Sequence, residues 1–275
     1  MSNETSATGF HHGPRRLVAE IGIVAAVLAL GIWGGAAVLR WAAVRAVEAL
    51  PVSVDQSLGK AAAGQFTWPD CGGEPSGALA ELAARFRPHV PEAFRGFRAR
   101  IVDAKEVNAF ALPGGNLYVL RGLVHSARRT EEVAGVLAHE VGHAVLRHGV
   151  RRIARQAGIS LALALVVGSQ EGVVDTLLSG AAQLQSLRFD RDEEREADRF
   201  GLELCALSGI APTALGEFLG RLPDGASVGA PEWLSTHPSS AQRRSDLERM
   251  LRERPAPRSA GPPLPSLERL RAPCG

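Results

Sequence analysis

Two imidazoles and a carboxylate stand within five residues of the sequence, in His139-Glu140-Val141-Gly142-His143. Two histidines four positions apart on a helix lie about 40° apart around its axis, so both imidazoles can point at one metal ion. The glutamate after the first histidine can act as general base toward a water molecule there. This H-E-x-x-H pattern predicts a hydrolytic zinc site, with His139 and His143 as ligands and Glu140 as base. The alternative is a pair of surface histidines on an ordinary helix.

An acidic run from Asp190 to Asp198 offers carboxylates for a third ligand. Catalytic zinc takes three protein ligands and keeps one position open. Glu194 and Asp198 are four residues apart and share a helix face, whereas Glu196 lies about 200° around the axis from Glu194. Because a ligand histidine needs an oriented hydrogen-bond acceptor behind it, we expect Glu194 to bind the metal and Asp198 to orient a histidine. A solvated charged helix is the alternative.

Hydrolysis also needs a donor for the negative charge that develops on the substrate carbonyl oxygen. His237 precedes a proline in a predicted loop, so it can approach the metal and take part in catalysis. A structural or helix-capping histidine is the alternative. Tyr118, the only tyrosine of the chain, lies instead in a predicted strand. His148 lies about 140° from His143 on the continuing helix, which predicts a structural role.

The H-E-x-x-H residues fall in a helix that we expect to run from Thr130 to His148, with Thr130 as N-cap and Gly149 as its stop. Ser76 is the expected N-cap of an earlier helix. Apolar periodicity predicts the remaining helices at 41–50, 76–88, 151–167, 172–187, within 190–222, and at 239–254. A linker is expected to begin at Pro51.

Strands are predicted where apolar and polar residues alternate, at 97–103, 107–112 and 116–120. The Pro113-Gly114-Gly115 segment is a strong turn signal and predicts a β-hairpin. Together with the helices this gives an α+β fold, mainly helical, with a small hairpin or sheet beside the H-E-x-x-H helix. The edge of such a hairpin can bind an extended peptide through its backbone. An ordinary structural hairpin is the alternative.

The first strongly apolar segment is Ile21–Leu39, 19 residues without a charge. As a helix it would be about 28 Å long, close to the hydrocarbon thickness of a bilayer. We therefore expect a retained transmembrane anchor over 17–40, after an N-terminal tail of residues 1–16. A cleaved signal peptide and a buried core helix are the alternatives. Two arginines lie close to each end of the segment, so the positive-inside rule does not choose an orientation.

Three cysteines bear on the compartment. Cys71 and Cys274 lie in polar, Gly/Pro-rich settings, and Cys205 lies in an apolar helical pattern. A disulfide between the first two would need an oxidising compartment, which favours an exported catalytic domain; two unpaired surface thiols are the alternative. We expect this domain to span 41–254 and the Pro-rich tail of 255–275 to be poorly ordered, with Cys274 as the exception.

Composition excludes several other classes of protein. A hydrophobic content of 45% excludes disorder for most of the chain, and a net charge of +2 argues against a general nucleic-acid binder. Three cysteines and no glycine period exclude disulfide-scaffold and collagen-like proteins. The expected partners are therefore protein or peptide substrates and a membrane, with no nucleic acid.

The motifs HEVGHAVLRHG (139–149) and EREADRFG (194–201) together resemble the HtpX-like and CAAX prenyl protease family of zinc metallopeptidases. The resemblance extends to NAFALPGGNLYVLRGL (108–123) and STHPSSAQRR (235–244), and it covers roughly residues 50–250. These proteins are gluzincin-type, membrane-associated endopeptidases, which implies a zincin-type domain. The form with a single N-terminal segment looks most like the bacterial periplasmic quality-control members.

The resemblance implies roles for individual residues. One zinc ion would be bound by His139, His143 and Glu194. Glu140 would be the base, Asp198 would lie behind a ligand histidine, and this agrees with the argument from helix faces. The histidine that matches His237 can instead occupy the open zinc position and hold the enzyme off. Substrate backbone is expected to bind along the predicted edge strand, at Asn108, Ala109, Phe110, Ala111 and Leu112.

These observations lead to one functional hypothesis and one rival. The hypothesis is a zinc-dependent, membrane-anchored endopeptidase that hydrolyses misfolded or unassembled proteins. It would sit in the bacterial inner membrane as a single-pass protein with a periplasmic catalytic domain. The rival is a membrane-anchored chaperone or assembly factor whose zinc is structural or kept closed. Prenyl-protein processing is not expected, because the chain lacks the many spans of the CAAX enzymes.

Overall fold

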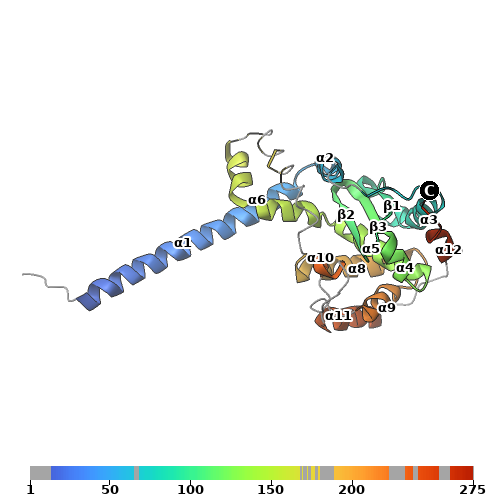
Figure 1. Ribbon diagram of the computed structural model, residues 1–275. Helices are drawn as coiled ribbons and strands as arrows, with labels where there is room; N and C mark the ends of the chain where they lie inside the picture. Colours follow the sequence, from blue (N-terminus) through green and yellow to red (C-terminus); the bar gives the residue numbers. More distant parts are fainter. Residues whose placement is uncertain are drawn as a thin grey trace, which may run out of the picture.

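The computed structural model describes residues 14–64, 68–167, 189–222, 233–237, 241–253 and 261–274, and a few single residues between 169 and 179. Within this part of the chain, helices surround a small three-stranded sheet (Figure 1). The predicted α+β, mainly helical class is confirmed. The helix predicted at 172–187 lies mostly outside the described residues.

The sheet consists of β1 (Arg98–Val102), β2 (Ala109–Leu112) and β3 (Asn116–Leu120), in the order β1-β3-β2. β2 and β3 form the predicted antiparallel hairpin, which turns through a 3-10 segment at Pro113–Gly115. β1 lies parallel to β3, so the hairpin is part of a larger sheet. β2 is an edge strand and contacts α5 (Thr130–Val145), the helix that carries the H-E-x-x-H residues.

Helix α5 crosses the acidic helix α8 (Arg191–Leu207) at close range. A Cβ atom at Gly142 of α5 would lie 3.1 Å from the carbonyl oxygen of Ala197. A Cβ atom at Gly201 of α8 would lie 3.0 Å from the backbone nitrogen of His139. Contacts this short are tighter than most Cβ contacts, so a side chain at either position would push the two helices apart by a few tenths of an ångström. The two glycines therefore set how closely the two helices approach.

The start of α8 is fixed by a capping box. The Asp190 side chain accepts hydrogen bonds from the backbone N–H groups of Asp192 and Glu193, and the Glu193 side chain accepts one from the backbone N–H of Asp190. Such a reciprocal cap satisfies donors that the helix itself leaves unpaired. The cap therefore fixes where Glu194 and Asp198 lie on the helix.

Helix α5 ends at Val145, before the predicted end at His148. Arg147 adopts the left-handed conformation with φ of 57°, which is uncommon for a residue with a side chain. Helix α6 (His148–Val167) begins directly after it. Gly149, the expected stop, lies inside α6. The sequence pattern missed this turn because Arg147 gives no glycine-like signal.

Two predicted N-caps are also wrong. Helix α3 (Gly73–Ala84) begins before Ser76, whose hydroxyl instead donates to the carboxylate of Asp70. The N-cap of α5 is Arg129 rather than Thr130. In both helices the hydroxyl has a partner outside its own helix end, which the local sequence pattern does not reveal.

The other helices complete the packing around α5 and the sheet. They are α2 (Val52–Ala63), α4 (Arg121–Ser126), α9 (Ala214–Arg221), α10 (Trp233–Thr236), α11 (Ala241–Arg252) and α12 (Leu267–Leu270), with 3-10 turns at Arg87–His89 and Glu92–Phe94. The helix predicted at 239–254 is thus confirmed as α11. The linker predicted from Pro51 is mostly the helix α2.

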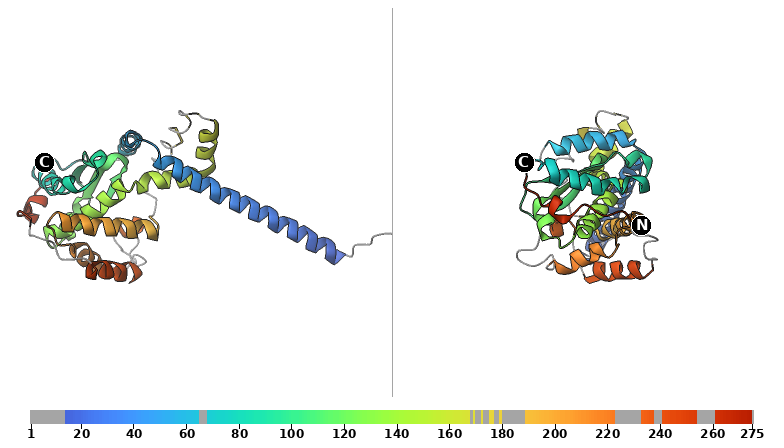
Figure 2. Two further views of the ribbon diagram at one scale, coloured as in Figure 1. Left: turned by 180° about the vertical axis from the view of Figure 1, so that it is seen from behind. Right: turned by 90° about the vertical axis from the view of Figure 1, so that its right-hand side faces the viewer.

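Helix α1 (Pro14–Glu48) is continuous, so the predicted anchor and the separate helix predicted at 41–50 are one element. Its segment Val18–Ala46 is the only one among the described helices long and apolar enough to cross a membrane. Its apolar side chains are exposed, as for Ile32 at 74% and Trp33 at 69%. Figures 1 and 2 show α1 projecting away from the other elements, with its C-terminal part beside α6. These features suit a helix surrounded by lipid.

Residues 261–274 pack against the domain, so the expectation of a poorly ordered tail is wrong for them. Arg269 forms ion pairs with Glu74 and Glu81 of α3, and Leu270 is 1% exposed. The proline content of the tail predicted little regular structure, but a short segment can be held by a few side-chain contacts. The tail thereby becomes part of the folded domain.

Cys71 and Cys274 are joined in a disulfide, whereas Cys205 is a buried free thiol. The bond closes a loop with a sequence separation of 203 residues. Disulfides of this kind persist in oxidising compartments. In the chain-entropy model, closing so long a loop stabilises the fold by about 5 kcal/mol.

Replacing both Cys71 and Cys274 by serine is expected to lower the free energy of unfolding by about 3–5 kcal/mol, because the unfolded chain regains its loop entropy. Urea unfolding of the detergent-solubilised protein measures the change. A reductant should shift the midpoint of the parent protein and leave that of the double variant unchanged. A Cys205→Ala control should keep the sensitivity to reductant. Equal midpoints for parent and double variant would contradict the prediction.

Candidate metal centre

Four buried side chains converge between α5, α8 and α10. His139 and His143 come from α5, Glu194 comes from the first turn of α8, and His237 directly follows α10. One ligand atom of each lies within 4.8 Å of all the others, and none of the four residues is more than 3% exposed. The structure thus brings together the three predicted ligands and the loop histidine.

The distances among these atoms suit a single zinc ion. His139 Nε2 lies 3.0 Å from His143 Nε2, and Glu194 oxygens lie 3.6 Å and 3.3 Å from the same two nitrogens. His237 Nδ1 lies 2.9 Å from Glu194 Oε1 and 3.3 Å from His139 Nε2. Ligand atoms on a tetrahedral zinc with bonds of about 2.0–2.1 Å are roughly 3.3 Å apart. Imidazole nitrogens and a carboxylate oxygen are also the donors that zinc takes.

Glu140 lies beside this cluster with one oxygen fixed and one available. Its Oε1 accepts a hydrogen bond of 3.2 Å from Trp233 Nε1 and lies 3.4 Å from His237 Nε2. Its Oε2 is buried and has no hydrogen-bond partner among the described residues. A buried oxygen in this state is costly unless something binds it, so the arrangement suits a residue that exchanges a proton with a bound water or substrate.

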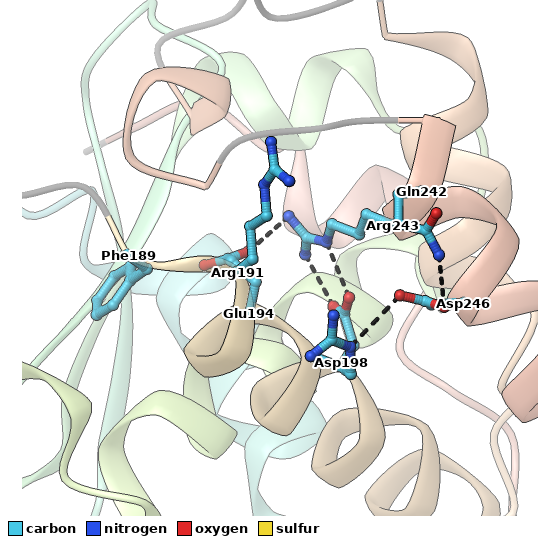
Figure 3. A pocket seen from close by; sticks show the side chains of 8 residues that line it. Phe189, Arg191, Glu194, Asp198, Gln242, Arg243 and Asp246 are labelled. Atoms are coloured by element: carbon cyan, nitrogen blue, oxygen red, sulfur yellow. Dashed lines mark hydrogen bonds and ion pairs between the residues drawn. The ribbon is translucent and has the colours of Figure 1, made fainter.

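Asp198 and Arg243 support the cluster from behind. Asp198 Oδ1 lies 2.9 Å from His139 Nδ1, as predicted for the carboxylate that orients a ligand histidine. Arg243 Nε and Nη2 each donate to Asp198 at 2.8 Å, and Nη1 lies 2.5 Å from Glu194 Oε2. Figure 3 shows this side chain reaching from α11 toward both carboxylates of α8. Arg243 was not predicted as a site residue, although it lies in the 235–244 motif.

Burial and charge set the protonation of the cluster. Burial raises the pKa of Glu194, but Arg243 and the imidazole of His237 outweigh it and hold the pKa well below its ordinary value. Burial also raises the pKa of Asp198, and Arg243 and His139 again lower it overall. Burial holds the pKa of His143 well below its ordinary value, so this imidazole is neutral. Burial lowers the pKa of His139, but Asp198 and Glu194 outweigh it and raise the pKa overall. Glu194 and His143 are thus in the forms that bind a metal, an ionised carboxylate and a neutral imidazole.

Two aromatic side chains enclose the histidines, and neither was predicted. The Trp233 ring stacks on the His237 ring with centroids 4.9 Å apart, and the Phe189 ring lies 3.9 Å from the His143 ring. Trp233 stands four residues before His237 in a helix, a spacing that could have indicated their contact. Phe189 directly precedes the cap of α8 and gives no comparable signal.

The predicted substrate residues lie along the edge strand beside α5. Asn108 precedes β2, is 5% exposed, and its Oδ1 has no hydrogen-bond partner among the described residues. The backbone N–H of Trp233 donates to the Val107 carbonyl, so α10 is hydrogen-bonded to the chain two residues before β2 begins. Phe110 stacks on Tyr118 with centroids 5.1 Å apart. Tyr118 therefore packs on the sheet and is not among the four clustered donors.

His148 has a different position from the expected one. Its Nδ1 lies 2.9 Å from His143 Nδ1, and its Nε2 lies 3.1 Å from a carboxylate oxygen of Glu196. The expected separation of about 140° from His143 is wrong, because the turn at Arg147 brings His148 back beside it. The predicted structural role of His148 stays a prediction. Glu196 does face away from the four donors, as predicted, and contacts them only through His148.

The sequence pattern of peptidase family M48 matches residues 78–251, more than half of the chain. The chain belongs to peptidase family M48. The match spans all four clustered donors and Glu140. Family membership and the donor cluster confirm the prediction of a metallopeptidase with a site for one zinc ion.

Curated relatives are similar over the same region. The chain is 40% identical over 147 residues to mitochondrial metalloendopeptidase OMA1 of Arabidopsis thaliana and 34% identical over 166 residues to mitochondrial metalloendopeptidase OMA1 of Bos taurus. It is 31% identical over 179 residues to the β-barrel assembly-enhancing protease of Escherichia coli. These alignments cover 52%, 55% and 60% of this chain and 29%, 32% and 36% of the relatives. The chain thus spans about a third of the length of these relatives.

The comparisons refine the resemblance drawn from the motifs. The predicted zinc metallopeptidase family is confirmed, because the HtpX and CAAX enzymes belong to the same family as the matching relatives. The matching relatives are instead named as OMA1 and β-barrel assembly-enhancing proteases. The M48 motifs are shared across these groups, so the motifs alone did not separate them.

Zinc removal is expected to lower the free energy of unfolding of this M48 domain by about 4 kcal/mol when free zinc exceeds its dissociation constant about 1,000-fold. Thermal unfolding with zinc and with a strong chelator measures the difference. In a His143→Ala variant the chelator should have little effect, whereas an exposed His89→Ala control should behave like the parent. An unchanged midpoint on zinc removal from the parent would contradict a zinc site here.

Proposed function

We propose that the chain is a zinc-dependent, membrane-anchored endopeptidase that hydrolyses peptide bonds of misfolded or unassembled proteins. The observation that carries the proposal is the buried cluster of His139, His143 and Glu194 with the uncommitted oxygen of Glu140 beside it. Relatives named as metalloendopeptidases and as β-barrel assembly-enhancing proteases support the substrate class.

The proposed ligands are His139, His143 and Glu194, and the proposed base is Glu140. When bound, zinc would supply Lewis-acid chemistry, polarising the scissile carbonyl and making an attacking water more acidic. Glu140 Oε2 takes the proton of that water and later delivers it to the leaving amine. The hydrogen bond from Trp233 holds Oε1 in place, so the proton is exchanged at the other oxygen.

The edge strand β2 is the proposed substrate platform. An extended peptide can add to the strand through backbone hydrogen bonds, which allows substrates of mixed sequence. The buried side-chain oxygen of Asn108, without a partner among the described residues, supports binding of a substrate N–H group there. Ala109 to Leu112 provide the backbone of the platform.

His237 is proposed to act as a latch. A catalytic zinc site keeps one position open for water or substrate. His237 Nδ1, at 2.9 Å from Glu194 Oε1 and 3.3 Å from His139 Nε2, fills the fourth corner of the donor set. Withdrawal of His237 would open that corner and allow turnover.

A single-pass inner-membrane location with a periplasmic catalytic domain completes the proposal. The exposed apolar helix α1 supports the anchor, and the bond between Cys71 and Cys274 supports an oxidising compartment. A reporter that is active only after export, fused to the C-terminus, tests the orientation. Activity of a reporter that works only in the cytoplasm would contradict it.

Replacing Glu140 by glutamine is expected to reduce turnover of an unfolded casein substrate by about 100- to 10,000-fold, the range that general acid–base groups supply. The zinc content should stay equal to that of the parent, because the general base does not bind the metal in this mechanism. Peptide release by the zinc-loaded protein measures the effect. Equal turnover by the Glu140→Gln protein would rule out the mechanism.

Replacing His237 by alanine is expected to raise proteolysis about three- to tenfold, as release of a closed state favoured by about 1 kcal/mol would do. Initial rates on the same casein, beside an exposed His125→Ala control, measure the change. A fall in rate at unchanged zinc content would assign His237 to the stabilisation of the oxyanion instead.

The second candidate function is a chaperone or assembly factor, which the complete set of four donors favours. Four protein ligands are typical of structural zinc. Retained zinc without proteolysis, in both the parent and the His237→Ala protein, would support that function over the peptidase.

A further inference from the structure

The two proposed ligand histidines of α5 are supported in different ways. A histidine that binds metal through Nε2 carries its hydrogen on Nδ1, and that N–H needs an acceptor to fix the ring. For His139 the acceptor is the carboxylate of Asp198, at 2.9 Å. For His143 the group at Nδ1 is a second imidazole, Nδ1 of His148, at 2.9 Å. The two rings meet at 72° with centroids 4.9 Å apart.

Only one of these two Nδ1 atoms can carry the shared hydrogen. His148 Nε2 faces a carboxylate oxygen of Glu196 at 3.1 Å, and a carboxylate only accepts, so the hydrogen of neutral His148 belongs on Nε2. His148 Nδ1 then presents a lone pair and accepts the N–H of His143. That leaves the lone pair of His143 on Nε2, the atom that points into the donor cluster.

The position of His148 depends on the turn at Arg147. On a continuous helix His148 would lie about 140° from His143 and could not reach it. The left-handed conformation of Arg147 ends α5 and turns the chain back. Its guanidinium donates to both oxygens of buried Asp55, at 2.9 Å and 2.6 Å, and to the carbonyl oxygen of Leu50 at 2.9 Å.

We infer that His148 is a positioning residue for the zinc ligand His143, and that Glu196 sets the tautomer in which His148 accepts its hydrogen bond. The inference rests on the proposed function, since it takes His143 as a ligand. His148 is 0% exposed, so water does not replace the acceptor when it is lost. Glu196 is half exposed, with its carboxylate also 3.6 Å from Arg151, and water can replace part of its effect.

The test is the zinc affinity of the full-length protein in detergent, measured by competition with a chromophoric chelator. His148→Phe keeps a ring and removes the acceptor, so it should weaken zinc binding about 10- to 100-fold. His148→Gln can accept from His143 and donate to Glu196, so it should stay within about threefold of the parent. Glu196→Ala should weaken zinc binding a few-fold, and it should have little further effect on zinc affinity when combined with His148→Phe. The exposed His125→Phe is the matched control.

A second measurement separates positioning from packing. The visible spectrum of the cobalt-substituted protein reports ligand geometry, and it should change in His148→Phe but not in His148→Gln. Native zinc affinity in His148→Phe, or equal losses in the phenylalanine and glutamine variants, would overturn the inference. If His148→Phe does not fold, His148→Leu, which also lacks an acceptor, takes its place with the same expected loss. An unchanged affinity in Glu196→Ala would overturn the role of Glu196 alone.

The same set of variants distinguishes failure of this inference from failure of the proposed function. His143→Ala should abolish high-affinity zinc binding if His143 is a ligand. Full zinc affinity in His143→Ala would remove the ligand assignment itself. Loss of zinc in His143→Ala together with native affinity in His148→Phe would leave the proposed function standing and reject only the positioning role.

Discussion

The close crossing of α5 and α8 determines the geometry of the whole donor cluster. Glycines at 142 and 201 let the two backbones approach more closely than they could with a side chain at either position. This approach carries Glu194 to both histidines of α5 and Asp198 to the far side of His139. The sheet, the capping box and the tail hold this pair of helices in place, while the chemistry arises where they meet.

The buried charges of the same cluster also favour a bound cation. Three carboxylates, those of Glu140, Glu194 and Asp198, are buried here with one guanidinium, that of Arg243. Buried charges are stable only when they are paired or bind a metal. Arg243 pairs with both Glu194 and Asp198, and a bound cation would offset the remaining negative charge. Arg243 thus lets a dense group of acids exist in the core, and the metal would complete the neutralisation.

The sequence predicted the parts of the site that depend on periodicity within one helix. His139, His143, Glu194 and Asp198 follow from spacing, and the hairpin follows from its turn residues. Arg243 reaches the site only through tertiary packing of α11, which no local pattern describes, whereas the spacing of Trp233 and His237 could have indicated their contact. His148 was misplaced because a single arginine in the left-handed conformation breaks the helix, and arginine at such a position gives no signal in the sequence.

The turn at Arg147 also determines where the catalytic unit can be separated from its anchor. Its guanidinium binds the carbonyl oxygens of Glu48, the last residue of α1, and of Leu50, in the short segment before α2. A fragment that starts at Val52 would lack both carbonyl acceptors. The partly buried guanidinium of Arg147 would then lose two hydrogen bonds. A fragment that keeps residues 46–51 retains them. The boundary for recombinant work therefore lies inside the end of α1, not at the start of α2.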